Sequence, residues 1–156
     1  MKLRILAVGT KMPRWVDDGV KEYSKRLPRD VSLEFLEIPL GARGKNPDIA
    51  KAIKQESDSL LSAIDKKDFV VALEVKGQSW STEVLAQKLE TWQMDGHNLA
   101  LLVGGPDGLS DACRARANQM WSLSALTLPH PIVRVILAEQ LYRAWTITQN
   151  HPYHRS

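Results

Sequence analysis

Short apolar runs alternate with amphipathic segments along the 156-residue chain. The apolar runs indicate strands buried in a sheet, and segments with an apolar residue every three or four positions indicate helices that cover it. Strands and helices that alternate in this way favour an α/β fold with a mainly parallel sheet flanked by helices. The predicted strands cover 2–9, 31–38, 69–75, 98–105 and 120–128 (the last a strand or an irregular apolar segment), and the predicted helices cover 14–27, 48–64, 82–94, 111–118 and 131–149.

Side chains at the helix boundaries support these assignments. Ser81 or Thr82 can cap the third predicted helix and Ser110 the fourth, because a hydroxyl oxygen accepts hydrogen bonds from the free amides of a first helical turn. In the first predicted helix, we expect Trp15 on the side that faces the core. The sequence contains no repeat, low-complexity segment or linker, so we expect residues 1–156 to form a single domain.

The last predicted helix is apolar on nearly every side. Its residues Ile132, Leu137 and Trp145 cannot all face one sheet. Such a helix needs a second partner, and in a small protein the simplest partner is its own symmetry mate. We therefore expect a homodimer with the helix 131–149 at its interface.

Composition places the chain among ordinary globular proteins, with 44% hydrophobic and 25% charged residues. No apolar run is long enough to span a membrane, and the first residues lack the apolar stretch of a signal peptide. The single cysteine, Cys113, has no partner for an internal disulfide, and its place inside a predicted helix favours a buried structural role. These features lead us to expect a cytoplasmic protein with no membrane partner.

Basic residues crowd the first third of the chain, although the net charge is only +3. A face of this kind could hold the phosphate backbone of RNA, with Arg14, Arg43 and Lys45 as candidate contacts. A solvated surface that keeps the protein soluble explains the same charges, and charge alone favours that interpretation.

A pair of glycines, Gly104 and Gly105, directly follows the predicted strand 98–105. Ligands of open α/β sheets bind beyond the carboxyl ends of the strands, and glycines there let a ligand approach the backbone. The pattern is neither GxGxxG nor GxxxxGK[ST], so it supports neither a dinucleotide fold nor a P-loop. Taken alone, the pair is equally consistent with a plain tight turn.

The segment 121–131, WSLSALTLPHP, is a second candidate for ligand binding. It places small and apolar residues beside free backbone amides, where an adenine ring could be held between aliphatic walls. The alternative is a core strand that ends at a Pro-His-Pro corner.

Three C-terminal motifs carry a resemblance to a known family: GGPDGLS (104–110), WSLSALTLPHPIVRVILAEQLYRAW (121–145) and NHPYHR (150–155). They closely resemble the SPOUT, or trefoil-knotted, methyltransferases, and within them the bacterial large-subunit ribosomal RNA pseudouridine N3-methyltransferases. The opening KLRILAVGTKMPRWV and the loop GARGKN share the likeness. The resemblance therefore extends over essentially the whole chain.

This resemblance implies a C-terminal trefoil knot, which pattern reasoning alone would have excluded because knots are rare. It also implies that the loops of the knot bind S-adenosyl-L-methionine. Carried over onto this chain, the cofactor-binding residues are Leu73, Gly104, Gly105, Leu123, Ser124, Ala125, Leu126, Thr127 and Leu128.

The implied reaction transfers a methyl group from S-adenosyl-L-methionine to N3 of a pseudouridine in 23S ribosomal RNA, with the ribosome as the partner. Two alternatives stay open. One is a knotted methyltransferase that acts on transfer RNA or on another ribosomal RNA base. The other is a non-catalytic ribosome-binding factor.

The polar segment after the last helix offers candidate catalytic residues. The N3–H of a pyrimidine must lose its proton as the nitrogen attacks the methyl group, so a base or a nearby cation lowers the barrier. His154 suits the first role and Arg155 the second, while Tyr153 could stack on the base. It is equally possible that these residues only lock the end of the helix. His151 and His154 lack a convincing third ligand, so we expect no metal site.

Overall fold

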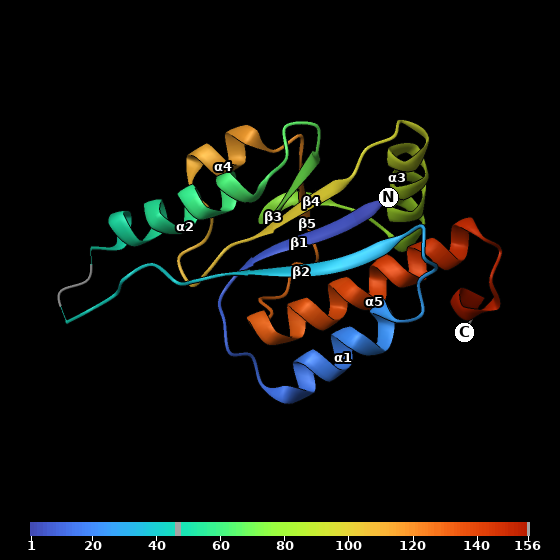
Figure 1. The fold of residues 1–156 in the computed structure, drawn as a ribbon, viewed down its shortest axis with the longest axis horizontal. Helices are drawn as coiled ribbons and strands as arrows, with labels where there is room; N and C mark the ends of the chain where they lie inside the picture. The colour runs from blue at the N-terminus through green and yellow to red at the C-terminus, as the bar shows by residue number, and fades with distance from the viewer. Residues whose placement is uncertain (46–47, 156) are drawn as a thin grey trace.

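The computed structural model describes residues 1–45 and 48–155, whose five strands form one parallel sheet (Figure 1). The strand order is β2-β1-β4-β3-β5, and every adjacent pair is parallel. The expected α/β fold with a mainly parallel sheet is therefore confirmed. In chain order the elements are β1 (Lys2–Val8), α1 (Arg14–Ser24), β2 (Ser32–Ile38), α2 (Ile49–Ala63), β3 (Phe69–Ser79), α3 (Thr82–Met94), β4 (Leu99–Val103), α4 (Asp111–Arg116), β5 (Gln119–Ser122), α5 (His130–Thr148) and the 3-10 helix η1 (Pro152–Arg155).

Helices cover both faces of the sheet (Figure 1). α3 and α5 cover one face, with α1 packed beside α5, and α2 and α4 cover the other. Alternate side chains of β1 point into the two layers, so that Ile5 belongs to the same buried cluster as Leu137 of α5, and Leu6 to that of Leu60 of α2. Burial on both faces explains why the central strands are apolar almost throughout.

The carboxyl ends of all five strands lie at one edge of the sheet, because the strands run in the same direction. β1 lies between β2 and β4 in the sheet. The chain passes from β1 to β2 on one side, whereas the later strands lie on the other side of β1, so the direction in which strands are added reverses at β1. Open α/β sheets bind ligands at such a point. The fold therefore places the ends of β1 and β4 where a ligand site is expected.

The predicted helix caps are confirmed. The Ser81 Oγ accepts a hydrogen bond from the Val84 amide at 3.1 Å, and the Ser110 Oγ accepts one from the Cys113 amide at 3.1 Å. Cys113 itself is fully buried, in agreement with the expected structural role. No helix in residues 1–45 and 48–155 combines the length and apolar character needed to cross a membrane.

The expectation that Trp15 faces the core is wrong, because its side chain is 54% exposed. Val16, which the same helical period places on this side, is 1% exposed and faces the core as expected; a Cβ at Gly19 would lie only 3.2 Å from Val135 of α5. The helix also ends earlier than predicted, at Ser24. The apolar period therefore identified the side of α1 that faces the core, but not which residues on that side are covered by other elements.

β3 continues past its predicted end at residue 75. The register shifts after Leu73, and Gln78 then pairs again with Trp121 of β5. A Cβ at Gly77 would lie 2.7 Å from the Trp121 backbone nitrogen, so a glycine is needed for the two strands to approach there. The irregular segment before Gln78 interrupts the strand pattern, so the sequence did not reveal that β3 continues.

The apolar perimeter of α5 is largely covered within the same chain. The helix contacts the sheet, α1 and α3, and Leu137, Leu141 and Ala144 are fully buried. Gln140 also accepts a hydrogen bond from Thr82 of α3 at 2.7 Å. Two helices of the same chain thus supply part of the second partner that we expected from a symmetry mate, while Val135, Ile136 and Trp145 stay half-buried and the dimer stays a prediction. Of its large apolar side chains, Ile132 stays exposed, at 41%.

Candidate functional site

A cavity of about 650 Å³ lies at the carboxyl edge of the sheet. Three segments that are far apart in the sequence meet there: the end of β3, the turn after β4 and the loop between β5 and α5. The volume is within the range of small-molecule sites in proteins. The predicted cofactor-binding residues that line it are Leu73, Gly104, Gly105, Leu123, Ser124, Leu126, Thr127 and Leu128, and Ala125 is exposed in the same loop.

The loop between β5 and α5 holds its shape through serine side chains. The Ser122 Oγ donates to the Ser124 carbonyl at 3.2 Å, and the Leu126 amide donates to the Ser124 Oγ at 2.9 Å. The amides of Ala125 and Thr127 make no hydrogen bond within the part of the chain that the structure describes. The loop thus contains backbone donors that no protein group uses, and one of them belongs to Thr127, which lines the cavity.

The two glycines after β4 are required by the turn itself. A Cβ at Gly104 would lie 2.8 Å from the Gly108 carbonyl carbon, and one at Gly105 would lie 2.9 Å from Val8. Gly108 has a φ of +81°, and its amide donates to the Gly105 carbonyl at 3.1 Å. Both glycines line the cavity, but their missing side chains make room for protein atoms. The turn is therefore compact before any ligand binds.

Arg43 ties the basic loop to this turn. Its Nη1 donates to the Glu56 Oε2 at 2.6 Å, and its Nε donates to the Asp107 Oδ2 at 3.1 Å. Glu56 is 2% exposed and also accepts from the Gly41 amide at 2.9 Å. The hydrogen bond with Glu56, followed by that with Asp107, raises the pKa of Arg43. The guanidinium group predicted to contact RNA is thus bound to two carboxylates.

Glu56 was missed by the sequence reasoning, although a signal was present. It lies in the row of α2 that contains Ala52 and Leu60, and both of these neighbours are buried. A carboxylate in the apolar row of a helix needs a buried cation. The Glu56 Oε1 is buried without a partner in the described residues and lies 3.1 Å from the Cβ position of Gly105.

A second arginine holds the other end of the same turn. The Arg114 Nη1 donates to the Leu109 carbonyl at 2.6 Å and to the Glu74 Oε1 at 3.2 Å. Its Nη2 pairs with Asp111. The hydrogen bond with Asp111, followed by that with Glu74, raises the pKa of Arg114. Glu74 also lines the cavity, directly after Leu73, and the sequence reasoning did not single it out.

The first turn of α5 closes the cavity opposite the glycine turn. His130 lines it, and burial together with the positive charge of Arg134 lowers the pKa of His130, so the ring is neutral near pH 7. Arg134 is 2% exposed; its Nη2 donates to the Gly9 carbonyl at 2.7 Å and its Nη1 to the Glu37 Oε2 at 2.7 Å. Arg134 therefore fixes the turn after β1 to α5 and is itself neutralised by Glu37.

The candidate catalytic residues lie at the opposite end of α5, in η1. The Tyr153 hydroxyl donates to the Glu139 Oε2 at 3.0 Å, and the His154 Nδ1 lies 3.4 Å from the Thr146 Oγ1. Arg155 is exposed. α5 contains 19 residues, which corresponds to about 28 Å of helix. η1 folds back on the helix, so that Tyr153 reaches Glu139, about 14 Å along α5 from His130, and none of its residues lines the cavity of its own chain.

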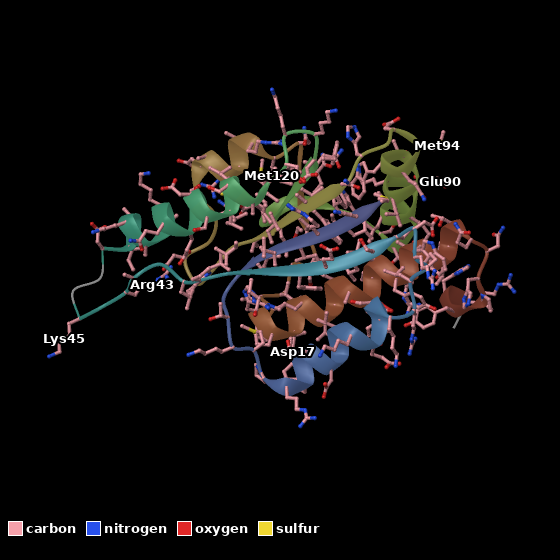
Figure 2. The ribbon with its side chains drawn as sticks, in the orientation of Figure 1. Asp17, Arg43, Lys45, Glu90, Met94 and Met120 are labelled. Carbon is pink, nitrogen blue, oxygen red and sulfur yellow. The ribbon has the colours of Figure 1, made fainter. Side chains whose placement is uncertain are left out.

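The three candidate RNA contacts differ in their surroundings. The Arg14 side chain is 94% exposed, and its Nε lies 4.0 Å from the Asp18 Oδ2, which makes a weak surface ion pair. Lys45 is exposed and lies at the far end of the basic loop, away from the sheet (Figure 2). Arg43 is held by carboxylates as described above. Asn46 and Pro47, which complete the predicted basic loop, lie outside the described residues.

Comparison with known proteins identifies the family of this chain. A family model described as "Predicted SPOUT methyltransferase" matches residues 1–154. The chain belongs to this family. It is 63% identical over 155 residues to a protein of Marinomonas sp. (strain MWYL1) named "Ribosomal RNA large subunit methyltransferase H", with 99% of this chain and 100% of that protein covered. A protein of Hahella chejuensis (strain KCTC 2396) with the same name is also 63% identical over 155 residues, with 99% of each chain covered.

A solved structure supports the fold independently of close sequence similarity. It is titled "The structure of a probable methylase family protein from Haemophilus influenzae Rd KW20" and matches with a TM-score of 0.60. The alignment covers 97% of this chain and 69% of that chain at 11% identity. Identity this low shows a shared fold alone. The resemblance carried by the sequence motifs is confirmed by the family model and by the two close relatives.

Proposed function

We propose that this SPOUT methyltransferase transfers a methyl group from S-adenosyl-L-methionine to N3 of a pseudouridine in 23S ribosomal RNA. The observation that carries the proposal is the meeting of Leu73, the Gly104-Gly105 turn and the loop 123–128 at one cavity. Both close relatives are named for the large-subunit ribosomal RNA. The choice of pseudouridine N3 rests on the resemblance of the C-terminal motifs. This substrate places the reaction in the cytoplasm.

The residues of the cavity fit S-adenosyl-L-methionine. Free amides at Ala125 and Thr127 suit the polar edge of an adenine, and the side chains of Leu126 and Leu128 offer aliphatic walls. When bound, the cofactor supplies a methyl group on a positively charged sulfur. Glu74 is a carboxylate on the wall of the cavity and so suits a cationic ligand.

The C-terminal segment supplies the acid–base groups in this proposal. Methyl transfer to N3 forms an N–C bond, leaves the sulfur as a neutral thioether and releases the N3 proton. His154 accepts that proton, Arg155 stabilises the negative charge that develops on the ring, and Tyr153 stacks on the base. These residues do not line the cavity of their own chain: Tyr153 contacts Glu139, about 14 Å along α5 from His130, and His154 lies beside Thr146, about 24 Å from it. We therefore propose a homodimer in which they act at the cavity of the partner copy.

RNA contacts in this proposal come from exposed cations on two segments. Arg14 begins α1, and Lys45 ends the described part of the basic loop. Arg43 contributes by holding the base of that loop against Glu56 and Asp107. Contacts of this kind position a nucleic acid without reading its sequence.

We also propose the C-terminal trefoil knot of the family. The loop 123–128 lies against the end of β3 and the turn after β4, and α5 then packs between α1 and α3. A chain end that passes beside two earlier loops in this way is compatible with threading through them.

Transfer of a labelled methyl group to purified substrates tests the proposed function. The protein is incubated with S-adenosyl-L-methionine and with intact ribosomes, free 23S ribosomal RNA or transfer RNA. We expect label in 23S ribosomal RNA, at a pseudouridine. Label in transfer RNA or in another base would assign a different substrate. If no RNA is labelled while the protein still binds ribosomes, it is a ribosome-binding factor and the proposal fails.

A further inference from the structure

The cavity wall carries one acidic side chain and no basic one. Among the described residues that line the cavity, Glu74 is the single Asp, Glu, Lys or Arg. The remaining lining residues are apolar or neutral, and His130 is kept neutral by burial and by Arg134. An apolar cavity with a single carboxylate favours ligands with a net positive charge.

The groups behind the wall add to this negative character. Arg43 is shared by Glu56 and Asp107, and Arg114 is shared by Glu74 and Asp111. Four carboxylates therefore share two guanidinium groups on the two sides of the glycine turn. Arg134, the remaining buried arginine near the cavity, is neutralised by Glu37. Within these ion pairs, five carboxylates face three guanidinium groups, so the paired groups carry an excess of negative charge.

We propose that Glu74 raises the affinity of the cavity for the positively charged methyl donor relative to its neutral product. This inference rests on the proposed function, because it assumes that the cavity binds S-adenosyl-L-methionine. The donor differs from S-adenosyl-L-homocysteine by the methyl group on its sulfur and by the sulfonium charge that this group brings. A carboxylate on the cavity wall therefore strengthens the binding of the donor more than the binding of the product. Loss of the charge after methyl transfer also removes one attraction that would hold the product in place.

Arg114 keeps the Glu74 side chain oriented without removing its effect. The Arg114 Nη1 lies 3.2 Å from the Glu74 Oε1, and the same guanidinium group pairs with Asp111. The Glu74 side chain stays 22% exposed, on the cavity side of the pair. Glu74→Gln keeps an oxygen that can accept from Arg114, so the variant removes the charge while conserving the local hydrogen bond.

Calorimetric titration without RNA tests the inference, because no methyl acceptor is then present. S-adenosyl-L-methionine and S-adenosyl-L-homocysteine are each titrated into wild-type protein, Glu74→Gln and the control Glu90→Gln. Glu90 is exposed on α3, far from the cavity (Figure 2). At an effective dielectric constant of about 20, a unit charge about 10 Å away changes affinity on the order of tenfold. We expect Glu74→Gln to weaken donor binding by about this factor, product binding to change less than about twofold, and Glu90→Gln to change neither.

Three outcomes would overturn parts of the account in distinguishable ways. If Glu74→Gln changes the affinities of both ligands equally, or of neither, the inference fails while the proposed function stands. If wild-type protein binds neither ligand, the proposed cofactor is wrong and the inference falls with it. Salt dependence in the wild-type protein gives a check that needs no variant. Added salt should weaken donor binding more than product binding, and equal weakening would contradict the role of Glu74.

Discussion

The hydroxyl of Tyr153 donates a hydrogen bond to the Glu139 Oε2 at 3.0 Å and so fastens the C-terminal segment to the middle of α5. Burial and then the hydrogen bond to Glu139 raise the pKa of Tyr153 to about 12. The phenol is therefore protonated throughout the physiological range. Its ionisation would remove the donor and place a second negative charge beside Glu139.

Tyr153→Phe is expected to lower the free energy of unfolding by about 1 kcal/mol at pH 7, the usual size of one hydrogen bond. Because the folded-state pKa lies above the ordinary value of 10.0, this contribution is fully present below pH 10 and is lost as the pH rises through about 12. Urea unfolding of both proteins at pH 7, 9 and 11 measures the difference. A difference that grows between pH 9 and pH 11 would contradict the assigned direction.

Mixed dimers test whether the C-terminal segment acts on a partner's cavity. A chain truncated after Asn150 and a chain with a damaged cavity should each be inactive alone, because each lacks one half of the site. When mixed, they should regain activity, since one dimer interface then combines an intact segment with an intact cavity. Methyl-transfer assays of the mixture, with sedimentation to establish the dimer, give the result. A monomer at micromolar concentration, or no recovery in mixed dimers, would exclude action across the dimer.

Substitutions in the C-terminal segment distinguish a catalytic role of its side chains from a purely structural one. His154→Ala should lower the methyl-transfer rate by about 10²-fold, the low end for a lost general base, while cofactor affinity is retained. Arg155→Ala should lower both the rate and the affinity for RNA, because a cation can serve the developing anion and a phosphate. Single-turnover kinetics at saturating cofactor measures both. Wild-type rates in both variants would leave only a structural role for this segment.

Gly104 and Gly44 form a matched pair for testing the glycine turn. A Cβ at Gly104 would lie 2.8 Å from the Gly108 backbone, whereas nothing lies within 4 Å of the same position at Gly44. Gly104→Ala should therefore distort the turn and reduce cofactor affinity, and Gly44→Ala should not. Titration with S-adenosyl-L-homocysteine and thermal melting measure the two effects. Unchanged affinity in a folded Gly104→Ala protein would show that the turn does not shape the cavity.

Arg43 is expected to matter for stability as well as for RNA. Arg43→Met would leave Glu56 buried and unpaired, which costs about 3 kcal/mol of unfolding free energy. The control Asp58→Asn breaks the exposed pair of Lys54 and Asp58 on the same helix and should cost at most about 0.5 kcal/mol. Chemical unfolding measures both values. Equal costs for the two variants would show that the buried pair has no special role.

The sequence pattern predicted the fold well because each strand is a distinct apolar run between turn signals. The same pattern could not find the second part of β3, which resumes only after a register shift at Leu73. It also could not show how much of α5 is covered within the same chain. Hydrophobic periodicity reports that a face is buried, but it does not say which element buries it, and here α1 and α3 do so.

The candidate site shows a similar division between local and distant information. The family resemblance assigned Leu73, Gly104 and the loop 123–128 to one pocket, and the structure brings them together at the carboxyl edge of the sheet. The place of Glu56 in an apolar row of α2 marked it as unusual, but the partners of Glu56 and Glu74 could not be assigned, because Arg43 and Arg114 lie elsewhere in the chain. Pairings between distant charged side chains follow from the packing of α2, α4 and the glycine turn, and leave no spacing signature in the sequence.

Mass mapping of ribosomal RNA tests the central claim most directly. The 23S ribosomal RNA is compared between cells that lack this protein, cells that regain the wild-type protein and cells that regain a His154→Ala variant. The account predicts one pseudouridine that lacks a methyl group at N3 in the first cells, carries it in the second and carries little of it in the third. Identical 23S ribosomal RNA masses in cells with and without the protein would contradict the proposed function.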